Sequence, residues 1–121
     1  MKEDVENPLA TKTYSFARKS IRLYRMLVAE HKEYVLSKQV LRSATSIGAN
    51  VAEANQAQSR PDFISKLSIA LKEAVETEYW LRLLKDEYFI AAPQADALLG
   101  DCREIIKILT ASIKTAKGRA S

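Results

Sequence analysis

The three prolines divide this chain of 121 residues into long stretches that lack any helix-breaking residue. Pro8, Pro61 and Pro93 are the only prolines, and only three glycines accompany them. Proline fits the first turn of a helix and breaks its interior, so each proline is expected near a helix start. The apolar residues between them follow helical spacing, and no stretch alternates as a β-strand does. The chain therefore favours an all-α fold and disfavours a β-sandwich, which needs many turns.

The apolar periodicity predicts four helices, at about residues 10–31, 36–57, 60–87 and 94–117. Ser59 is the expected N-cap of the third helix, with Asp62 three residues further on, and Gly118 is expected to end the fourth. Short connections place successive helices antiparallel, as in an up-down-up-down four-helix bundle. We therefore expect one domain, divided into a flexible segment at 1–9, the bundle at 10–118 and a tail at 119–121.

Apolar residues recur every three or four positions along the first and last helices, which predicts the faces that form the core. On the first helix the expected stripe is Ala17, Ile21, Tyr24 and Val28, flanked by Phe16, Leu23 and Leu27. On the last helix it is Leu98, Cys102, Ile105 and Leu109, with Leu99, Ile106 and Ile113 beside it. Cys102 is therefore interpreted as a buried apolar residue, with a reactive thiol as the alternative.

The segment 36–57 is unusual because only three of its residues are charged. One side of it consists of small residues, and an uncharged polar stripe runs beside its apolar arc. That stripe is made of Gln39, Ser43, Ser46 and Asn50, and it ends at Glu53. A helix with so few charges is expected to contact protein on most sides, which favours burial against a neighbouring subunit. A small-residue core helix in a monomer is the alternative.

In the third helix, Glu78 falls within the arc of the core stripe formed by Leu67, Leu71, Ala74 and Leu81. A carboxylate that faces a core needs partners, because an unpaired buried charge is costly. The expected partners are on the second helix: Arg42, Ser46 or Asn50. Together with Ser43 and Glu53, these residues are expected to form a polar network or part of a subunit interface. A functional role for the carboxylate is the alternative. Glu73 and Glu76 point to other faces, where they are expected to contact solvent or another subunit.

Positive charge is concentrated on the first helix. The chain has a net charge of +4, and residues 10–35, with six basic and two acidic side chains, have that charge by themselves. The basic residues on or beside the outward arc are Lys12, Arg18, Lys19, Arg22, Arg25 and Lys32. Such a stripe can contact phosphates at successive turns, which predicts a nucleic-acid-binding surface with RNA as the favoured ligand. A solvated face, or pairing with the acidic third helix of another subunit, is the alternative. No stacking aromatic residues are interleaved with these basic side chains.

The residue inventory argues against catalysis and against a metal or cofactor site. One cysteine excludes an internal disulfide, and His31, the only histidine, excludes multi-histidine metal centres. The sequence has no Glu-x-x-His pair of di-iron bundles, no glycine-rich phosphate loop and no nucleophile elbow. No apolar run approaches the roughly 20 residues of a membrane span, and the start is polar and acidic. We expect a cytoplasmic protein that is not an enzyme.

Three segments of the sequence match the motifs of a known family. Residues 42–54, RSATSIGANVAEA, resemble the "RSxxSIxANIAEA" segment of the bacterial four-helix-bundle family, also called the 23S rRNA intervening-sequence protein family. Residues 59–70, SRPDFISKLSIA, resemble its "SRxDFIxKLxIAxKE" segment, and residues 76–81, ETEYWL, resemble its "ETxYWL" segment. The resemblance covers the central half of the chain.

This resemblance implies an antiparallel bundle that assembles as a ring, commonly a homopentamer, with no established enzymatic activity. A more distantly similar bundle, the accessory variability protein of diversity-generating retroelements, binds reverse transcriptase and nucleic acid. We therefore expect an oligomeric adaptor that binds RNA or DNA, or an RNA-handling protein such as a reverse transcriptase, through its first helix. A protein–protein scaffold ring without nucleic-acid contact is the alternative.

Overall fold

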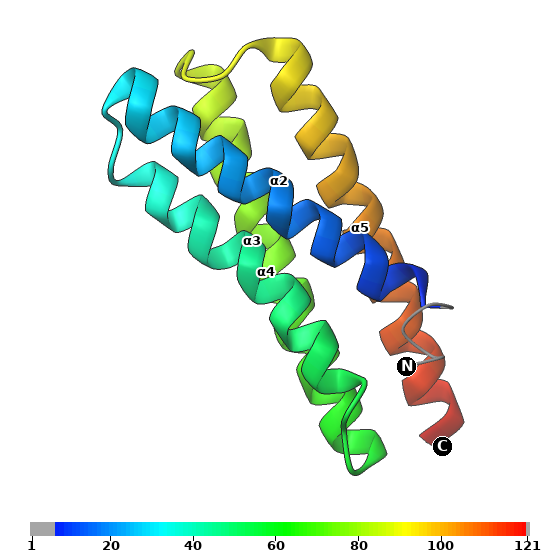
Figure 1. Cartoon of the computed structure of the whole chain (residues 1–121). Helices are drawn as coiled ribbons and strands as arrows, with labels where there is room; N and C mark the ends of the chain where they lie inside the picture. The colour runs from blue at the N-terminus through cyan, green and yellow to red at the C-terminus, as the bar shows by residue number, and fades with distance from the viewer. Residues whose placement is uncertain (1–6, 121) are drawn as a thin grey trace.

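The structure is a computed structural model that describes residues 7–120, and the side chains of residues 7–118. Within this range it has no strand and four helices: α2 (Pro8–His31), α3 (Leu36–Ala54), α4 (Arg60–Asp86) and α5 (Ala92–Ala120). Successive helices run in opposite directions (Figure 1). The predicted all-α fold with four antiparallel helices is therefore confirmed.

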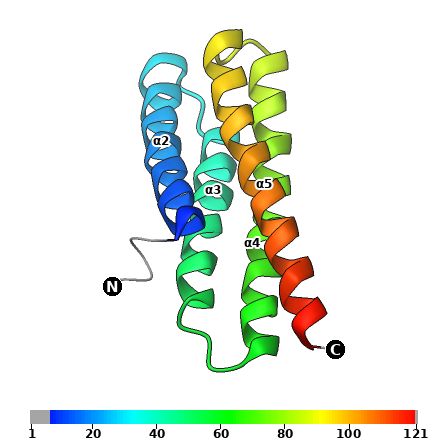
Figure 2. The same ribbon diagram turned by 90° about the vertical axis from the view of Figure 1, so that its right-hand side faces the viewer.

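The helices follow one another around the bundle in chain order. α3 packs between α2 and α4, α5 packs mainly on α4, and α2 contacts α5 more sparsely than it contacts α3 (Figure 2). The α2–α3 and α4–α5 turns lie at one end of the bundle, and the α3–α4 turn lies at the other (Figure 1). Since neighbours on both sides cover α3, much of its uncharged surface is buried within the chain itself.

Two of the helices begin at the side-chain caps that local sequence dictates. The Asn7 side chain accepts hydrogen bonds from the backbone N–H groups of Leu9 and Ala10, at 3.0 and 3.2 Å, with Pro8 as the first helical residue. The Ser59 hydroxyl accepts one from Asp62 at 3.2 Å, which confirms the predicted N-cap of the third helix. The predicted end of the flexible segment 1–9 is wrong, because Asn7 caps α2 and the helix itself begins at Pro8. Residues 1–6 lie outside the described residues.

Two helix ends differ from the predicted ones. α3 ends at Ala54 instead of 57, because the chain tightens into a turn in which Gln56 N–H bonds to the Glu53 carbonyl at 3.0 Å. Gly118 does not end α5, which continues to Ala120 into the predicted tail 119–121. A glycine ends a helix by taking a left-handed conformation, and none of the described glycines has a positive φ.

The buried face of α2 differs from the predicted stripe. Phe16, Leu23 and Leu27, predicted as flanks, are buried together with Leu9, whereas the predicted centre at Ala17, Ile21, Tyr24 and Val28 is half-buried. Thr13 and Ser20 take core positions as well. Their hydroxyls donate to the carbonyls of Leu9 and Phe16 at 2.8 and 2.9 Å, so these polar groups are satisfied inside the helix. Because these two polar residues are buried, the core face of α2 is centred on a different side of the helix from the purely apolar stripe.

The other core predictions agree more closely with the structure. On α5, all the predicted core residues are buried except Ile106, which is half-buried. Cys102 is fully buried, as predicted, and its thiol lies 3.2 Å from the carbonyl oxygen of Ala74 on α4. On α3, the apolar arc is buried from Val40 to Ala54, with Leu36 half-buried at its start.

Candidate nucleic-acid interface

The basic residues of α2 separate into an outward row and a row that faces α5. Arg18, Arg22 and Arg25 are exposed or half-exposed and lie on the side of α2 opposite its buried face. Within residues 7–118 these three arginines form no ion pair. They lie on the helix surface that neither α3 nor α5 covers, which leaves their guanidinium groups available to an external anion.

The two lysines beside this row are paired within the chain. Lys12 Nζ lies 3.1 Å from Glu104 Oε1, and Lys19 Nζ lies 2.8 Å from Asp101 Oδ2. Both pairs are substantially exposed and join α2 to α5, so each contributes at most about 1 kcal/mol to stability. These two predicted binding residues are therefore engaged with carboxylates, and any contact with phosphate competes with those pairs.

Lys32 has a different position from the arginines. It follows the last residue of α2, and its backbone is left-handed, with a φ of 53°. The next residue, Glu33, donates its N–H to the Leu27 carbonyl at 3.1 Å, which closes the helix end. The exposed Lys32 side chain thus extends the positive surface to the α2–α3 turn.

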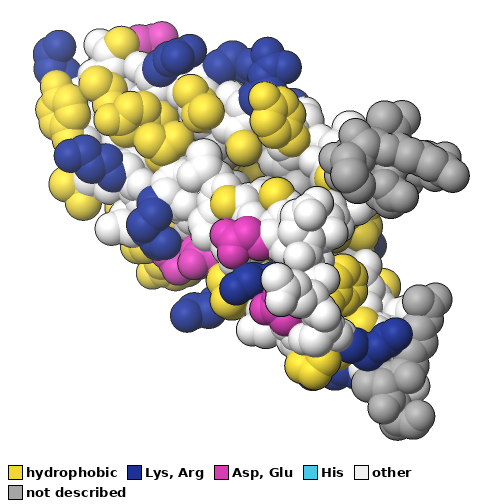
Figure 3. All heavy atoms as spheres, turned by 60° about the horizontal axis from the view of Figure 1, so that its bottom comes forward, with side chains coloured by type: hydrophobic (Ala, Val, Ile, Leu, Met, Phe, Trp, Pro, Cys, Tyr) yellow, Lys and Arg dark blue, Asp and Glu magenta, His cyan; other side chains and the backbone are white. Residues whose placement is uncertain are grey.

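The surface around this row combines positive and apolar side chains. In Figure 3, hydrophobic side chains gather over α2 and the first turns of α3, with Lys and Arg side chains on both sides of them. Most acidic side chains in this view lie lower on the molecule. The exposed or half-exposed apolar residues of this region are Tyr14, Ile21, Tyr24, Val28, Tyr34 and Val35.

A groove of about 940 Å³ separates the first half of α2 from α3. Apart from Val51, its α3 wall consists of small or polar residues, among them Thr45, Ala49 and Ala52. The two helices approach each other closely at Gly48, where an added Cβ would lie 3.4 Å from the Thr13 carbonyl oxygen. Small residues on α3 therefore allow close helix approach, as predicted, and also leave the groove open on its outer side.

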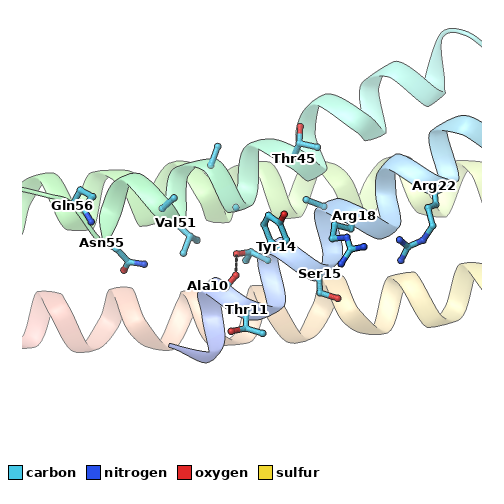
Figure 4. Close-up of a pocket in the computed structure, with 15 residues that line it drawn as sticks. Ala10, Thr11, Tyr14, Ser15, Arg18, Arg22, Thr45, Val51, Asn55 and Gln56 are labelled. Carbon is cyan, nitrogen blue, oxygen red and sulfur yellow. Dashed lines mark hydrogen bonds between the residues drawn. The ribbon is translucent and has the colours of Figure 1, made fainter. Parts of the chain in front are cut away.

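Tyr14, Arg18 and Arg22 line the α2 side of this groove (Figure 4). The Tyr14 ring lies between the two helices, and the two guanidinium groups follow it along α2. The Tyr14 side chain is 70% exposed. The expectation that no aromatic residue accompanies the basic stripe is therefore wrong, because Tyr14 lies one helical turn before Arg18 on the same face. The spacing of four residues between Tyr14 and Arg18 is the sequence signal that could have placed this ring beside the arginines.

The predicted polar residues of α3 and α4 do not form one network. Arg42 binds Glu76 and, at 3.3 Å, Glu73, and the Trp80 indole N–H donates to Glu76 at 3.1 Å. Both carboxylates expected to contact solvent or another subunit are thus held by an arginine of the same chain. This cluster joins the outer surfaces of α3 and α4.

Glu78 has a partner other than those predicted. Its carboxylate lies 2.6 Å from Nε of Arg103 on α5, and it is half-buried at the edge of the core. The predicted partners Arg42, Ser46 and Asn50 are on α3. The helix turns Glu78 toward α5 instead, because Thr77 occupies the buried position that faces α3.

The remaining members of the predicted set form separate local pairs. Ser43 is buried and bonds to Thr77 of α4. Asn50 donates within α3 to the Ser46 carbonyl, at 2.9 Å, and to its hydroxyl, at 3.2 Å. Glu53 is exposed and lies 3.7 Å from Nζ of Lys66 on α4. Most of these pairs link or stabilise helices, so they have structural roles within the chain.

Glu33 is a structural residue that the sequence interpretation missed. Its carboxylate accepts backbone N–H bonds from Val35, Leu36 and Ser37, at 3.0, 2.9 and 2.6 Å, and so caps the start of α3. Burial by itself would raise the pKa of Glu33, but these hydrogen bonds outweigh it and lower the pKa below the ordinary 4.5. The signal was an acidic residue a few positions before a helix whose own N-cap, Val35, has no capping side chain.

Neither a metal-binding cluster nor a reactive thiol is found among the described residues. Among the described residues, no three His, Cys, Asp or Glu side chains are placed to hold a metal ion. Burial, reinforced by the charge of Glu78, raises the pKa of the Cys102 thiol to about 12, so this thiol is a poor nucleophile. None of the described helices is both long and apolar enough to cross a membrane.

The fold and the site define a class of small four-helix proteins whose first helix has a row of arginines on its exposed face. Residues 6–111 match the family model of the 23S rRNA-intervening sequence protein, and the chain therefore belongs to this family. It is also similar to the crystal structure of a protein of unknown function from the S23 ribosomal protein family of Bacteroides thetaiotaomicron. The two share 55% sequence identity and a TM-score of 0.87, over 88% of this chain and 98% of that chain. No curated protein matches the chain. The distant similarity to the retroelement protein stays a prediction.

Proposed function

We propose that this protein is a non-enzymatic adaptor that assembles as a ring-shaped oligomer, with a homopentamer favoured, and binds nucleic acid through α2. The favoured ligand is RNA, bound directly or together with an RNA-handling protein. The observation that carries this proposal is the outward row of Arg18, Arg22 and Arg25, which forms no ion pair within residues 7–118. Arginines spaced by three or four residues on one helix face suit successive phosphates of a nucleic-acid backbone.

The acidic residues of α4 support this proposal over charge pairing between subunits. If these arginines paired with Glu73 and Glu76 of a neighbouring subunit, they would be unavailable to RNA. Arg42 of the same chain already binds both carboxylates. Pairing across subunits would first have to break these contacts, so the arginines of α2 are better matched to an external anion.

Self-association is supported by apolar side chains on the outer face of α4. Ile69, Val75 and Tyr79 are exposed by 39%, 50% and 53%, although they lie in the middle of a long helix. Their burial against another subunit would remove apolar surface from water. Light scattering tests this part: a particle about five times the 13.6 kDa of one chain is expected, and a monomer would contradict the ring.

Filter binding to a structured RNA over a range of salt concentrations tests the binding surface. The triple variant Arg18→Gln, Arg22→Gln, Arg25→Gln should bind more weakly. The slope of the logarithm of the binding constant against the logarithm of the salt concentration should become shallower by about 2–3 for each subunit that contacts the RNA. The matched control is Lys72→Gln, Arg82→Gln, Lys107→Gln, which removes the same charge from exposed positions on α4 and α5. If both triple variants weaken RNA binding equally, the net positive charge of the protein attracts the RNA and the arginine row of α2 is not its specific binding surface.

The second candidate function is a protein–protein scaffold that never contacts nucleic acid. The exposed apolar face of α4 favours it, because the same residues can bind another polypeptide. Absence of RNA binding at low salt, or binding with no salt dependence, would reject the nucleic-acid proposal and leave the scaffold.

A further inference from the structure

The charged side chains that line the groove between α2 and α3 are all positive. Arg18 and Arg22 line it, and none of its lining residues, all within residues 10–56, is acidic. A partner that enters this groove therefore gains from negative charge and meets no repulsion from a carboxylate of the wall. The occupant must also be narrow, since the space is an open cleft between two packed helices.

Tyr14 adds a flat apolar surface to this positive groove. Its ring is 70% exposed and forms no ring contact with the other aromatic side chains of residues 7–118. The ring lies between the helices, and the Arg18 and Arg22 side chains follow it along α2 (Figure 4). Their backbone positions are four and eight residues beyond Tyr14, a rise of about 6 Å along the helix axis for each step. An exposed aromatic ring followed by arginines matches a base that stacks while its neighbouring phosphates are neutralised.

The opposite wall leaves room for such a base. Ala49 and Ala52 provide little bulk, so a planar ring can enter beside Tyr14. The Thr45 hydroxyl, on the same wall, donates to the Leu41 carbonyl at 2.7 Å, so its oxygen can still accept a hydrogen bond. Asn55, whose amide oxygen accepts from Asn7 at 3.3 Å, and Gln56 follow the end of α3 and add amide groups that can donate hydrogen bonds. These polar groups flank the ring position without adding charge.

We propose that this groove binds a segment of single-stranded RNA, with one base stacked on Tyr14 and adjacent phosphates on Arg18 and Arg22. The proposal rests on the proposed function and specifies its ligand. Single-stranded RNA is favoured over duplex because bases in a duplex are already stacked and paired, and cannot present a free face to Tyr14. It is favoured over an acidic peptide because the aromatic ring contributes most when its partner is also planar.

Fluorescence anisotropy tests this proposal with a labelled oligouridylate of about 12 nucleotides and with an RNA duplex of the same length. Tyr14→Leu should weaken binding of the single strand about ten-fold and leave duplex binding nearly unchanged. Tyr14→Phe, which retains the ring, should bind as the unmodified protein does. The matched control is Tyr88→Leu, which removes an exposed tyrosine of the α4–α5 turn, outside both the groove and the apolar face of α4, and should have no effect on either probe.

The outcomes separate this proposal from the broader one. If Tyr14→Leu binds the single strand as well as Tyr88→Leu does, while the arginine triple variant binds weakly, the groove proposal fails and the proposed function stands. If the unmodified protein binds neither probe at low salt, both fail. If Tyr14→Leu changes the particle mass in light scattering, a second copy of the chain occupies the groove, and the RNA proposal is overturned.

Discussion

The hydroxyl of Thr77 on α4 lies 2.8 Å from the hydroxyl of Ser43 on α3, and both side chains are fully buried. Each hydroxyl also reaches a carbonyl of its own helix, Glu73 at 2.8 Å for Thr77 and Gln39 at 3.0 Å for Ser43. The pair therefore joins two helices inside an otherwise apolar core without leaving a polar group unsatisfied. Such a pair specifies one register of α3 against α4, because a shift along either helix would separate the hydroxyls.

Removal of either hydroxyl of this pair should destabilise the fold. Ser43→Ala and Thr77→Val should each lower the free energy of unfolding by about 1–2 kcal/mol, because the remaining hydroxyl loses a buried partner. The double variant should lose about 1 kcal/mol less than the sum of the two single losses. Urea denaturation of the four proteins measures this coupling, and strict additivity would show that the two hydroxyls do not interact.

Loss of the Glu33 cap should destabilise the protein in a pH-dependent way. Glu33→Gln should lower the free energy of unfolding at pH 7 by about 1 kcal/mol, because α3 begins at this carboxylate. The pKa of Glu33 is lower in the folded protein, so its contribution is complete above the ordinary pKa of 4.5 and is lost as the pH falls toward the folded value. Thermal unfolding at pH 7 and near pH 3 should therefore show a smaller difference between the two proteins at the lower pH.

The Cys102 thiol should be inert in the folded protein. Because burial raises its pKa to about 12, an aromatic disulfide reagent at pH 8 should react with it only after denaturant unfolds the chain. The folded protein keeps this proton above the ordinary pKa of 9.0, whereas the unfolded chain releases it. Stability should therefore fall between pH 9 and 12, by up to about 1.4 kcal/mol per pH unit, and Cys102→Ala should lack this component. Rapid labelling of the native protein would contradict the buried position.

Gly100 should be replaceable by alanine with a gain in stability. It lies within α5, it is exposed, and a Cβ added there would meet no atom within 4 Å. Alanine restricts the unfolded chain and favours the helix, so Gly100→Ala should raise the free energy of unfolding by about 0.5–1 kcal/mol. Gly48→Ala is the matched comparison, because its Cβ would lie 3.4 Å from the Thr13 carbonyl oxygen and should reduce the gain. A gain at Gly48 as large as at Gly100 would show that α2 and α3 separate easily there.

The class of fold follows from the amino-acid sequence, because the signals that specify it are local. Pro8, Pro61 and Pro93 restrict their own backbones and mark helix starts, and Ser59 caps within its own turn. The apolar spacing of α5 places Cys102 and its neighbours on one face whatever lies opposite. The family motifs between residues 42 and 81 identify the same bundle.

The pairing of polar side chains, in contrast, depends on how the helices pack against one another. Lys12 and Lys19 belong to the basic stripe in the sequence, yet α5 brings Glu104 and Asp101 against them and leaves the arginines unpaired within residues 7–118. Glu78 was expected to meet α3 but binds Arg103. A side chain's partner depends on the rotation of two helices about their axes, and that rotation follows from the packing of the whole core. Burial of Thr13 and Ser20 centres the core face of α2 away from its apolar stripe, so that Tyr14 and Arg18, neighbours through their spacing of four residues, both line the groove.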